Sequence, residues 1–229
     1  MKVHVIRDNG FPVEQYEQVM KLLQATAGLI SFVKQSPTIS VIEPEELPII
    51  INDTLLVDKG GQLVKKKNYR NDYEWEYFFY QCATYRQSSN LPKDDFVIIL
   101  TPKNNSYRYL AAFSDNTLDV FVKTSEWGSY LACDPVFPVA FTVMSQVLQK
   151  LYFEDMERRS DEGHSPALGC ISDFCEYKHE VIYKFRTADI CMDCLEKMLK
   201  AGIPQEYFIQ AFNLFETVRT EMLFKQRHQ

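Results

Sequence analysis

Five apolar residues stand in succession at Phe96-Val97-Ile98-Ile99-Leu100, between Asp94-Asp95 on one side and Pro102 on the other. A run of this length without polar alternation is typical of a strand that is buried on both faces. The aspartates before it and the proline after it favour turns and so mark its two ends. We therefore expect residues 96–100 to be the central strand of a sheet that is covered from both sides.

The segments that follow predict an edge of the sheet and a helix. Residues 107–113 and 118–123 are strand-like, and the four residues between them favour a turn, so together they predict a hairpin or an edge pair. From residue 138 to residue 153 apolar side chains recur every three or four positions, which predicts an amphipathic helix. The charged residues 154–163 are typical of an exposed loop.

The amino-terminal part of the chain predicts further strands around one helix. Residues 3–6 alternate apolar and polar side chains as a strand does, and residues 13–27 carry apolar side chains at helical spacing. Short β-branched or apolar runs at residues 30–33, 38–42 and 49–51 predict three more strands.

A basic run and an aromatic helix lie between these strands and the central one. The basic run at residues 65–67 favours a solvated loop over an anion site. Asn71 or Asp72 can cap a helix that extends to about Arg86, and its aromatic side chains favour a position in the core.

Four of the six cysteines crowd together, with the spacing Cys170-x4-Cys175-x15-Cys191-x2-Cys194. Two short-range pairs of thiolates suit the tetrahedral site that zinc prefers. Because four protein ligands leave no open position for water or substrate, the predicted zinc ion is structural and supplies folding free energy. The alternative is a group of four buried thiols without a metal, which leaves their clustering unexplained.

The carboxy-terminal part completes the predicted architecture. A short helix at residues 190–200 is stopped by Gly202, and a final helix extends from Pro204 to about residue 225. The order of elements predicts an α/β or α+β domain with a mixed sheet over residues 1–160. A four-cysteine zinc module with the terminal helix follows over residues 161–229, and we expect both parts to form one continuous compact unit.

Composition excludes several classes of function. The net charge is −6, and residues 164–229 contain 8 Lys and Arg against 9 Asp and Glu, so the basic footprint of a nucleic-acid-binding protein is missing. No two of the four histidines can share a helix turn, which excludes histidine-pair metal motifs. No segment is apolar enough to cross a bilayer and the amino terminus lacks a signal core, so we expect a cytoplasmic protein.

The cysteine spacing and the segments before it resemble the archaemetzincin-like zincin peptidases, over about residues 96–200. The signature of that family is a helix bearing HExxHxxGxxH, followed at once by C-x4-C-x-M and later by C-x-x-C. Cys170 and Cys175 match the first cysteine pair, and Cys191 and Cys194 match the second. The resemblance implies a zincin-like fold in which these four residues hold one structural zinc ion.

The catalytic half of the signature is missing. The resemblance implies that residues 96–101 are the central strand of the family and that residues 107–124 line its substrate cleft. The helix expected at residues 138–153 has neither histidine nor glutamate where two histidines and a glutamate are required, and Gly169 stands where the third histidine precedes Cys170. The resemblance therefore implies no catalytic metal and no catalytic residue.

We favour a catalytically inactive, zincin-like protein that serves as a protein-binding or scaffolding subunit. His164, six residues before Cys170, cannot by itself replace a three-ligand site with an open position. The alternative is a hydrolase with a non-standard site, either completed by a partner or built on Cys133 as nucleophile with His164 or His179 as base. A nucleic-acid-binding zinc ribbon is the least favoured reading of the same cysteines.

Two surfaces could receive the partner, which we expect to be another protein or a peptide and not a membrane. The predicted edge at residues 107–123 can hold an extended peptide by backbone hydrogen bonds. The final helix has a wider apolar arc than one packed face needs, and Leu214, Leu223 and Phe224 lie partly outside its main stripe.

Overall fold

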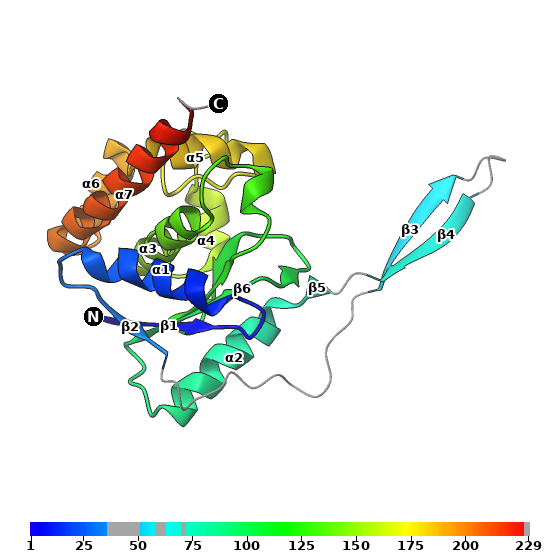
Figure 1. The fold of residues 1–229 in the computed structure, drawn as a ribbon, viewed down its shortest axis with the longest axis horizontal. Helices are drawn as coiled ribbons and strands as arrows, with labels where there is room; N and C mark the ends of the chain where they lie inside the picture. Colours follow the sequence, from blue (N-terminus) through cyan, green and yellow to red (C-terminus); the bar gives the residue numbers. More distant parts are fainter. Residues whose placement is uncertain (36–50, 58–62, 70–71, 227–229) are drawn as a thin grey trace.

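A five-stranded sheet forms the centre of the computed structural model, which describes residues 1–35, 51–57, 63–69 and 72–226 (Figure 1). The strand order is β2-β1-β6-β9-β8. The bounds of these strands are β1 Lys2–Arg7, β2 Ser31–Lys34, β6 Phe96–Thr101, β8 Ala111–Phe113 and β9 Asp119–Lys123.

The central strand is β6, as the apolar run predicts. It pairs in parallel with β1 and β9, so that Ile98 lies between Val5 and Val120. All six residues of β6 are buried. The pair of β8 and β9 is antiparallel and β8 lies at the edge, which confirms the predicted edge pair.

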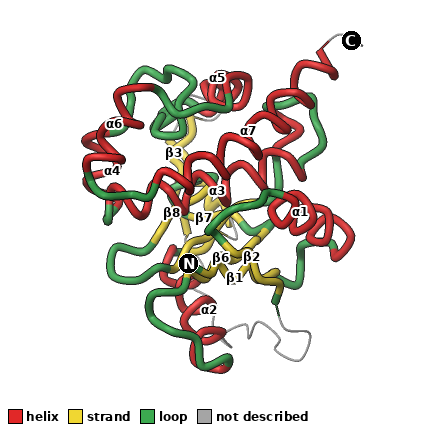
Figure 2. The backbone as a smooth tube through the Cα atoms, turned by 90° about the vertical axis from the view of Figure 1, so that its left-hand side faces the viewer, coloured by secondary structure: helices red, strands yellow, loops and turns green. Residues whose placement is uncertain are grey.

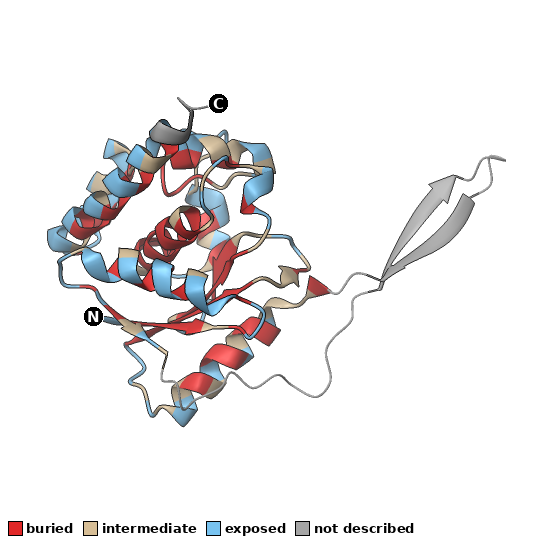
Figure 3. Ribbon diagram, viewed as in Figure 1, coloured by how far each residue is buried: buried red, intermediate tan, exposed pale blue. Residues whose placement is uncertain are grey.

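Helices cover both faces of this sheet. On one face lie α1 (Val13–Ala25), α3 (Val136–Phe153) and α7 (Gln205–Gln226), and on the other lies α2 (Trp75–Ser88) (Figures 1 and 2). Nearly every residue of α3 is buried, because the helix packs between the sheet and both α1 and α7 (Figure 3). The mixed α/β fold class expected from the sequence is confirmed.

Two short sheets accompany the main one. The strands β3 (Ile51–Val57) and β4 (Leu63–Tyr69) form an antiparallel hairpin, and β5 (Asp72–Tyr73) pairs in parallel with β7 (Asn104–Asn105). The loop predicted for the basic run at residues 65–67 is wrong, because these lysines continue β4 and Lys67 stands opposite Asp53. The strand predicted at residues 38–42 lies outside the described residues.

The carboxy-terminal third is helical. Before α7 it contains the 3-10 turn η2 (Lys178–Glu180) and three short helices, α4 (Met156–Glu162), α5 (Val181–Thr187) and α6 (Met192–Lys200). The loop predicted at residues 154–163 is therefore wrong. Asp155 caps α4 by accepting the Arg158 N–H at 2.7 Å, and Arg158 pairs with Glu162 at 2.7 Å, so local polar contacts support a helix that has no apolar stripe.

The last helix is tied to the first strands. The side-chain oxygen of Gln210 accepts the Ile30 N–H at 2.9 Å, and the side-chain nitrogen donates to the Ile30 carbonyl at 2.8 Å. Deeper in the core, the rings of Phe215 and Phe141 lie 4.6 Å apart. Leu214, expected partly outside the packed face, is buried, whereas Leu223 is 54% exposed. Within the described residues no helix is both long and apolar enough to span a membrane.

Candidate functional site

Four side chains meet where the segment after α4 reaches the start of α6. The ligand atoms of His164, Cys170, Cys191 and Cys194 all lie within 4.8 Å of one another. His164 Nε2 is 3.3 Å from the Cys191 sulfur and 3.2 Å from the Cys194 sulfur. Three sulfurs and one imidazole nitrogen in this arrangement are the donor set of a closed tetrahedral zinc site.

Main-chain contacts bring the two halves of this cluster together. The Ile171 N–H donates to the Asp189 carbonyl at 2.9 Å, which places Cys170 beside the residues that precede α6. Cys191 is the residue at the amino-terminal cap of α6, and Cys194 lies in its first turn. The Cys170 sulfur also accepts the N–H groups of Ser172 and Cys191, each at 3.4 Å.

Asp173 shapes the turn that presents Cys170. Its buried carboxylate accepts the N–H groups of Leu168 at 3.1 Å, Gly169 at 2.7 Å and Cys170 at 3.0 Å. Gly169 has a φ of +91°, and a Cβ there would meet the Thr187 hydroxyl at 2.4 Å. The turn therefore requires glycine immediately before Cys170.

Two cysteines of the cluster have pKa values shifted in opposite directions. The hydrogen bond from the Cys194 thiol, together with the N–H groups of Cys191 and Ser172, lowers the pKa of Cys170 to about 4. The pKa of Cys194 is raised, chiefly because its thiol donates that hydrogen bond. The thiolate is the form of cysteine that binds a metal ion, so this pKa shift suits a metal site.

The structure brings together three of the four predicted cysteines and does not bring Cys175 to them. Cys175 has a φ of +52° and lines a neighbouring cavity, and burial raises the pKa of its thiol. Hydrogen bonds to Asp173 hold residues 168–173 in a tight turn. The sulfurs of Cys170 and Cys175, five residues apart, therefore do not face the same metal position. His164 takes the fourth place, and the only signal for it in the sequence is its nearness to Cys170.

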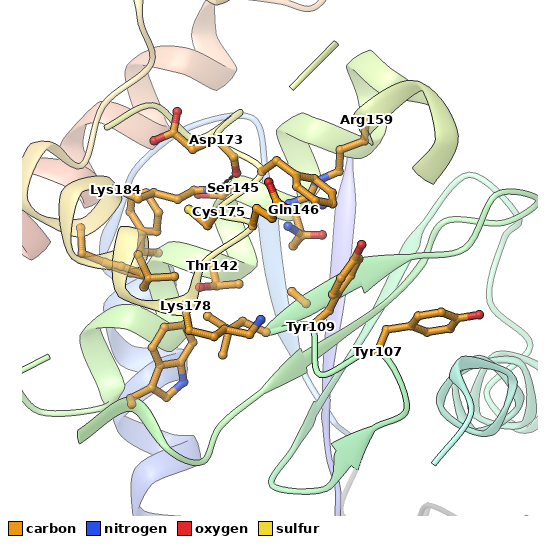
Figure 4. Close-up of a pocket in the computed structure, with 18 residues that line it drawn as sticks. Tyr107, Tyr109, Thr142, Ser145, Gln146, Arg159, Asp173, Cys175, Lys178 and Lys184 are labelled. Carbon is orange, nitrogen blue, oxygen red and sulfur yellow. Dashed lines mark hydrogen bonds between the residues drawn. The ribbon is translucent and has the colours of Figure 1, made fainter. Parts of the chain in front are cut away.

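The neighbouring cavity, called the cleft below, has a volume of about 280 Å³ (Figure 4). Thr142, Ser145 and Gln146 of α3 line it, as does Ala111 of the edge strand β8. Arg159 of α4 and side chains between residues 173 and 185 also line it, together with Tyr107, Tyr109, Leu110, Trp127 and Phe141. The cleft therefore lies between the long central helix and the edge strand.

A polar network runs along the cleft side of α3. Gln146 donates to the Gln149 side-chain oxygen at 3.3 Å, and Arg159 Nε donates to the same oxygen at 2.6 Å. Gln149 in turn donates to the Ile171 carbonyl. Ser145, Gln146 and Gln149 have the spacing i, i+1, i+4, which is also the spacing of the two histidines and the glutamate in HExxH. The apolar periodicity of residues 138–153 predicts the helix but carries no signal for this network, whose members are polar.

The histidines considered as bases for Cys133 have other neighbours. His164 faces the cysteine cluster, and the ring of His179 stacks on Tyr177 at 5.8 Å between centroids. Cys133 itself is half-buried just before α3. The described contacts thus give the Cys133 alternative no added support.

The fold is similar to those of two archaeal proteins of known structure. A zinc-dependent peptidase from Methanocorpusculum labreanum matches with a TM-score of 0.53 and 15% identity, over 86% of this chain and 99% of that chain. Archaemetzincin from Methanopyrus kandleri matches with a TM-score of 0.50 and 13% identity, over 88% of this chain and 94% of that chain. No protein-family model matches the sequence, and neither does any curated protein. The chain thus has a zincin-like α/β fold of the archaemetzincin type, as the resemblance implies.

Proposed function

We propose that this protein is a zinc-stabilised, catalytically inactive relative of the zincin peptidases that acts by binding another protein or a peptide. One observation carries the proposal. A set of three thiols and one imidazole stands beside a cleft whose central helix presents Ser145, Gln146 and Gln149 instead of histidine and glutamate. The metal site and the cleft are therefore separate features.

The zinc ion of this proposal is structural and is held by His164, Cys170, Cys191 and Cys194. Four protein ligands leave no position for a water molecule, so the ion closes the chain between α4 and α6 and supplies folding free energy. The zinc-dependent peptidase of the same fold supports the choice of metal. No disulfide links the six cysteines, all of which the structure describes, and this suits the reducing cytoplasm.

The purified protein is expected to contain one zinc ion per chain. His164→Ala should lose most of the bound zinc because it removes one of four ligands, whereas Cys175→Ala should retain it because that thiol lies in the cleft wall. Elemental analysis of both variants measures this directly. Loss of zinc from Cys175→Ala with retention in His164→Ala would restore the four-cysteine site predicted from spacing.

The protein is expected to show no chelator-sensitive peptidase activity. A zincin needs a second zinc ion with an open position and a general base, and α3 offers only a hydroxyl and two amides at the corresponding spacing. Incubation with a peptide library, followed by mass spectrometry, tests this. Cleavage that a chelator abolishes contradicts the proposal, and cleavage that survives chelation but fails in Cys133→Ala establishes the cysteine-hydrolase alternative.

The edge strand β8 offers one docking surface. The backbone N–H of Lys123 donates to the Leu110 carbonyl, and the backbone N–H of Ser114 donates to the Asp119 carbonyl, each at 2.8 Å. The backbone groups of residues 110 and 114 therefore bond to β9. Because antiparallel pairing alternates, the backbone groups of Ala111 and Phe113 point to the open side of the sheet. An extended peptide can add there as a further strand.

The terminal helix offers the second surface, through Leu223. Replacing Leu223 and Phe224 together by glutamate should abolish association with a partner while changing the melting temperature little, since Leu223 is half-exposed. The matched control is Leu214→Glu, which places a charge at a position that is 1% exposed and should unfold the protein. Native co-purification reads out association. Unfolding of the double variant would show that these residues belong to the core.

A further inference from the structure

A buried arginine without a carboxylate partner lines the cleft. Arg159 is 7% exposed, its Nε donates to Gln149, and the centre of its guanidinium lies 5.8 Å from the Phe174 ring. Within the described part of the chain no carboxylate lies within 4 Å of that guanidinium. A buried charge of this kind is costly unless an anion compensates it, and desolvation accordingly lowers the pKa of Arg159.

Two lysines add to this positive potential. Lys184 is buried and donates to the Asp173 carbonyl at 3.1 Å, and Lys178 holds its Nζ 5.7 Å from the Tyr109 ring (Figure 4). Burial lowers the pKa of Lys178, and the charges of Lys123 and Arg159 lower it further, so the cations lie close enough to repel one another.

The acidic groups near the cleft offset these cations only in part. Asp173 already accepts three backbone N–H groups, and Glu176 is exposed to solvent. The cleft therefore has room for an added anion, which the charges of Arg159 and Lys178 favour.

Two buried polar atoms in the same wall lack a partner within the described structure. The Ser145 hydroxyl belongs to a residue that is 1% exposed, and the Gln146 carbonyl oxygen belongs to a residue that is 3% exposed. A hydroxyl can donate to a carboxylate, and an amide oxygen can accept an N–H from the same ligand. Together they match a ligand that carries a carboxylate and an amide N–H.

Part of the remaining wall is aromatic. Trp127, Phe141 and Phe185 line the cleft, and the Phe185 ring lies 5.3 Å from the Trp127 ring and 4.7 Å from the Phe141 ring between centroids. Such a surface favours an apolar or aromatic side chain on the ligand.

We propose that the cleft binds the carboxy-terminal residue of a peptide, with the free carboxylate beside Arg159 and Lys178 and an apolar side chain against Trp127 and Phe141. This inference rests on the proposed function and names the ligand of its cleft. The preceding peptide residues can leave along the open side of β8, because Ala111 lines the cleft. The Ser145 hydroxyl donates to the carboxylate, and the Gln146 oxygen accepts the last peptide N–H.

The test compares three probes by calorimetry: acetyl-dialanyl-phenylalanine with a free carboxylate, the same peptide as its amide, and 3-phenylpropionate. We expect the acid peptide to bind at least tenfold more tightly than its amide, because charge-assisted hydrogen bonds to the carboxylate are lost in the amide. Weaker binding of 3-phenylpropionate assigns the site to a peptide terminus, whereas equal binding of both acids assigns it to free carboxylates and overturns the peptide assignment. Equal binding of peptide acid and amide, or no binding of either, overturns the proposal.

Variants of Arg159 and Lys178 test whether these two side chains bind the carboxylate. Arg159→Gln should weaken binding of the acid peptide about tenfold or more, and Lys178→Ala several-fold. The matched control, Lys93→Ala, removes an exposed lysine that does not line the cleft and should leave binding unchanged. If Arg159→Gln fails to fold, Lys178→Glu decides, since a reversed charge should eliminate binding. Unchanged affinity in Lys178→Glu contradicts the proposal.

The same experiment separates this inference from the proposed function. Mass spectrometry of the peptide recovered after titration shows whether it is intact. A cleaved peptide contradicts the proposal that the protein is catalytically inactive. An intact peptide that does not bind contradicts only the proposal that the cleft binds a peptide carboxy terminus.

Discussion

Cys191→Ser is expected to release the zinc ion and to unfold the chain from about residue 165 onward. Structural zinc sites contribute on the order of 10–16 kcal/mol of binding free energy. The total stability of a typical domain is about 5–15 kcal/mol, so loss of a ligand outweighs what the short helices around the site can supply. Limited proteolysis should cut first between residues 165 and 200, before the buried strand β6.

The matched control for this variant is Cys175→Ser. It makes the same chemical change five residues after Cys170, in a side chain outside the group of four ligand atoms. We expect it to keep its zinc and its resistance to protease. A strong chelator should make the unmodified protein resemble Cys191→Ser. If Cys191→Ser retains both zinc and the wild-type melting temperature, the cluster is not the structural metal centre.

Asp173→Ala is expected to cost about 3 kcal/mol or more of unfolding free energy. The two buried N–H groups of Gly169 and Cys170 and the partly buried N–H of Leu168 lose their acceptor, at about 1–3 kcal/mol for each buried group. For a chain of this size that corresponds to a fall in melting temperature of roughly 6–12 °C. Because the same turn presents Cys170, zinc affinity should also fall, by about 10- to 100-fold.

Asp173→Asn separates the hydrogen bonds from the charge. The amide keeps one oxygen, which can accept the N–H groups of Gly169 and Cys170, and loses the acceptor for Leu168. We expect roughly a third of the destabilisation in thermal unfolding and little loss of zinc. Equal effects of alanine and asparagine would mean that the negative charge of Asp173, and not its geometry, supports the turn.

The strands and long helices could be predicted because each carries its own signal. Residues 96–100 are apolar throughout because helices cover both faces, and the apolar residues of 138–153 recur at helical spacing although α3 is buried on nearly every side and not on one face alone. The helix α4 carries no such signal. Its stability comes from a cap and an ion pair, which a search for apolar periodicity does not register.

The candidate site was predictable only in part. Cys191 and Cys194 lie on one helix turn, so their spacing fixes their geometry. The partner of Cys170 depends on a turn that Asp173 closes, and spacing along the chain cannot distinguish His164 from Cys175. Arg159 enters the cleft from a helix that was predicted as a loop, so the positive character of the cleft could not be predicted either.

The contact between Gln210 and Ile30 bears on the order in which the chain is made. A side chain near the end of the sequence bonds both backbone groups of a residue just before β2, as a neighbouring strand would. During synthesis, Ile30 therefore lacks both hydrogen bonds until residue 210 has left the ribosome exit tunnel. About 180 residues must be added after Ile30 before these bonds can form, and a chain truncated before α7 cannot form them.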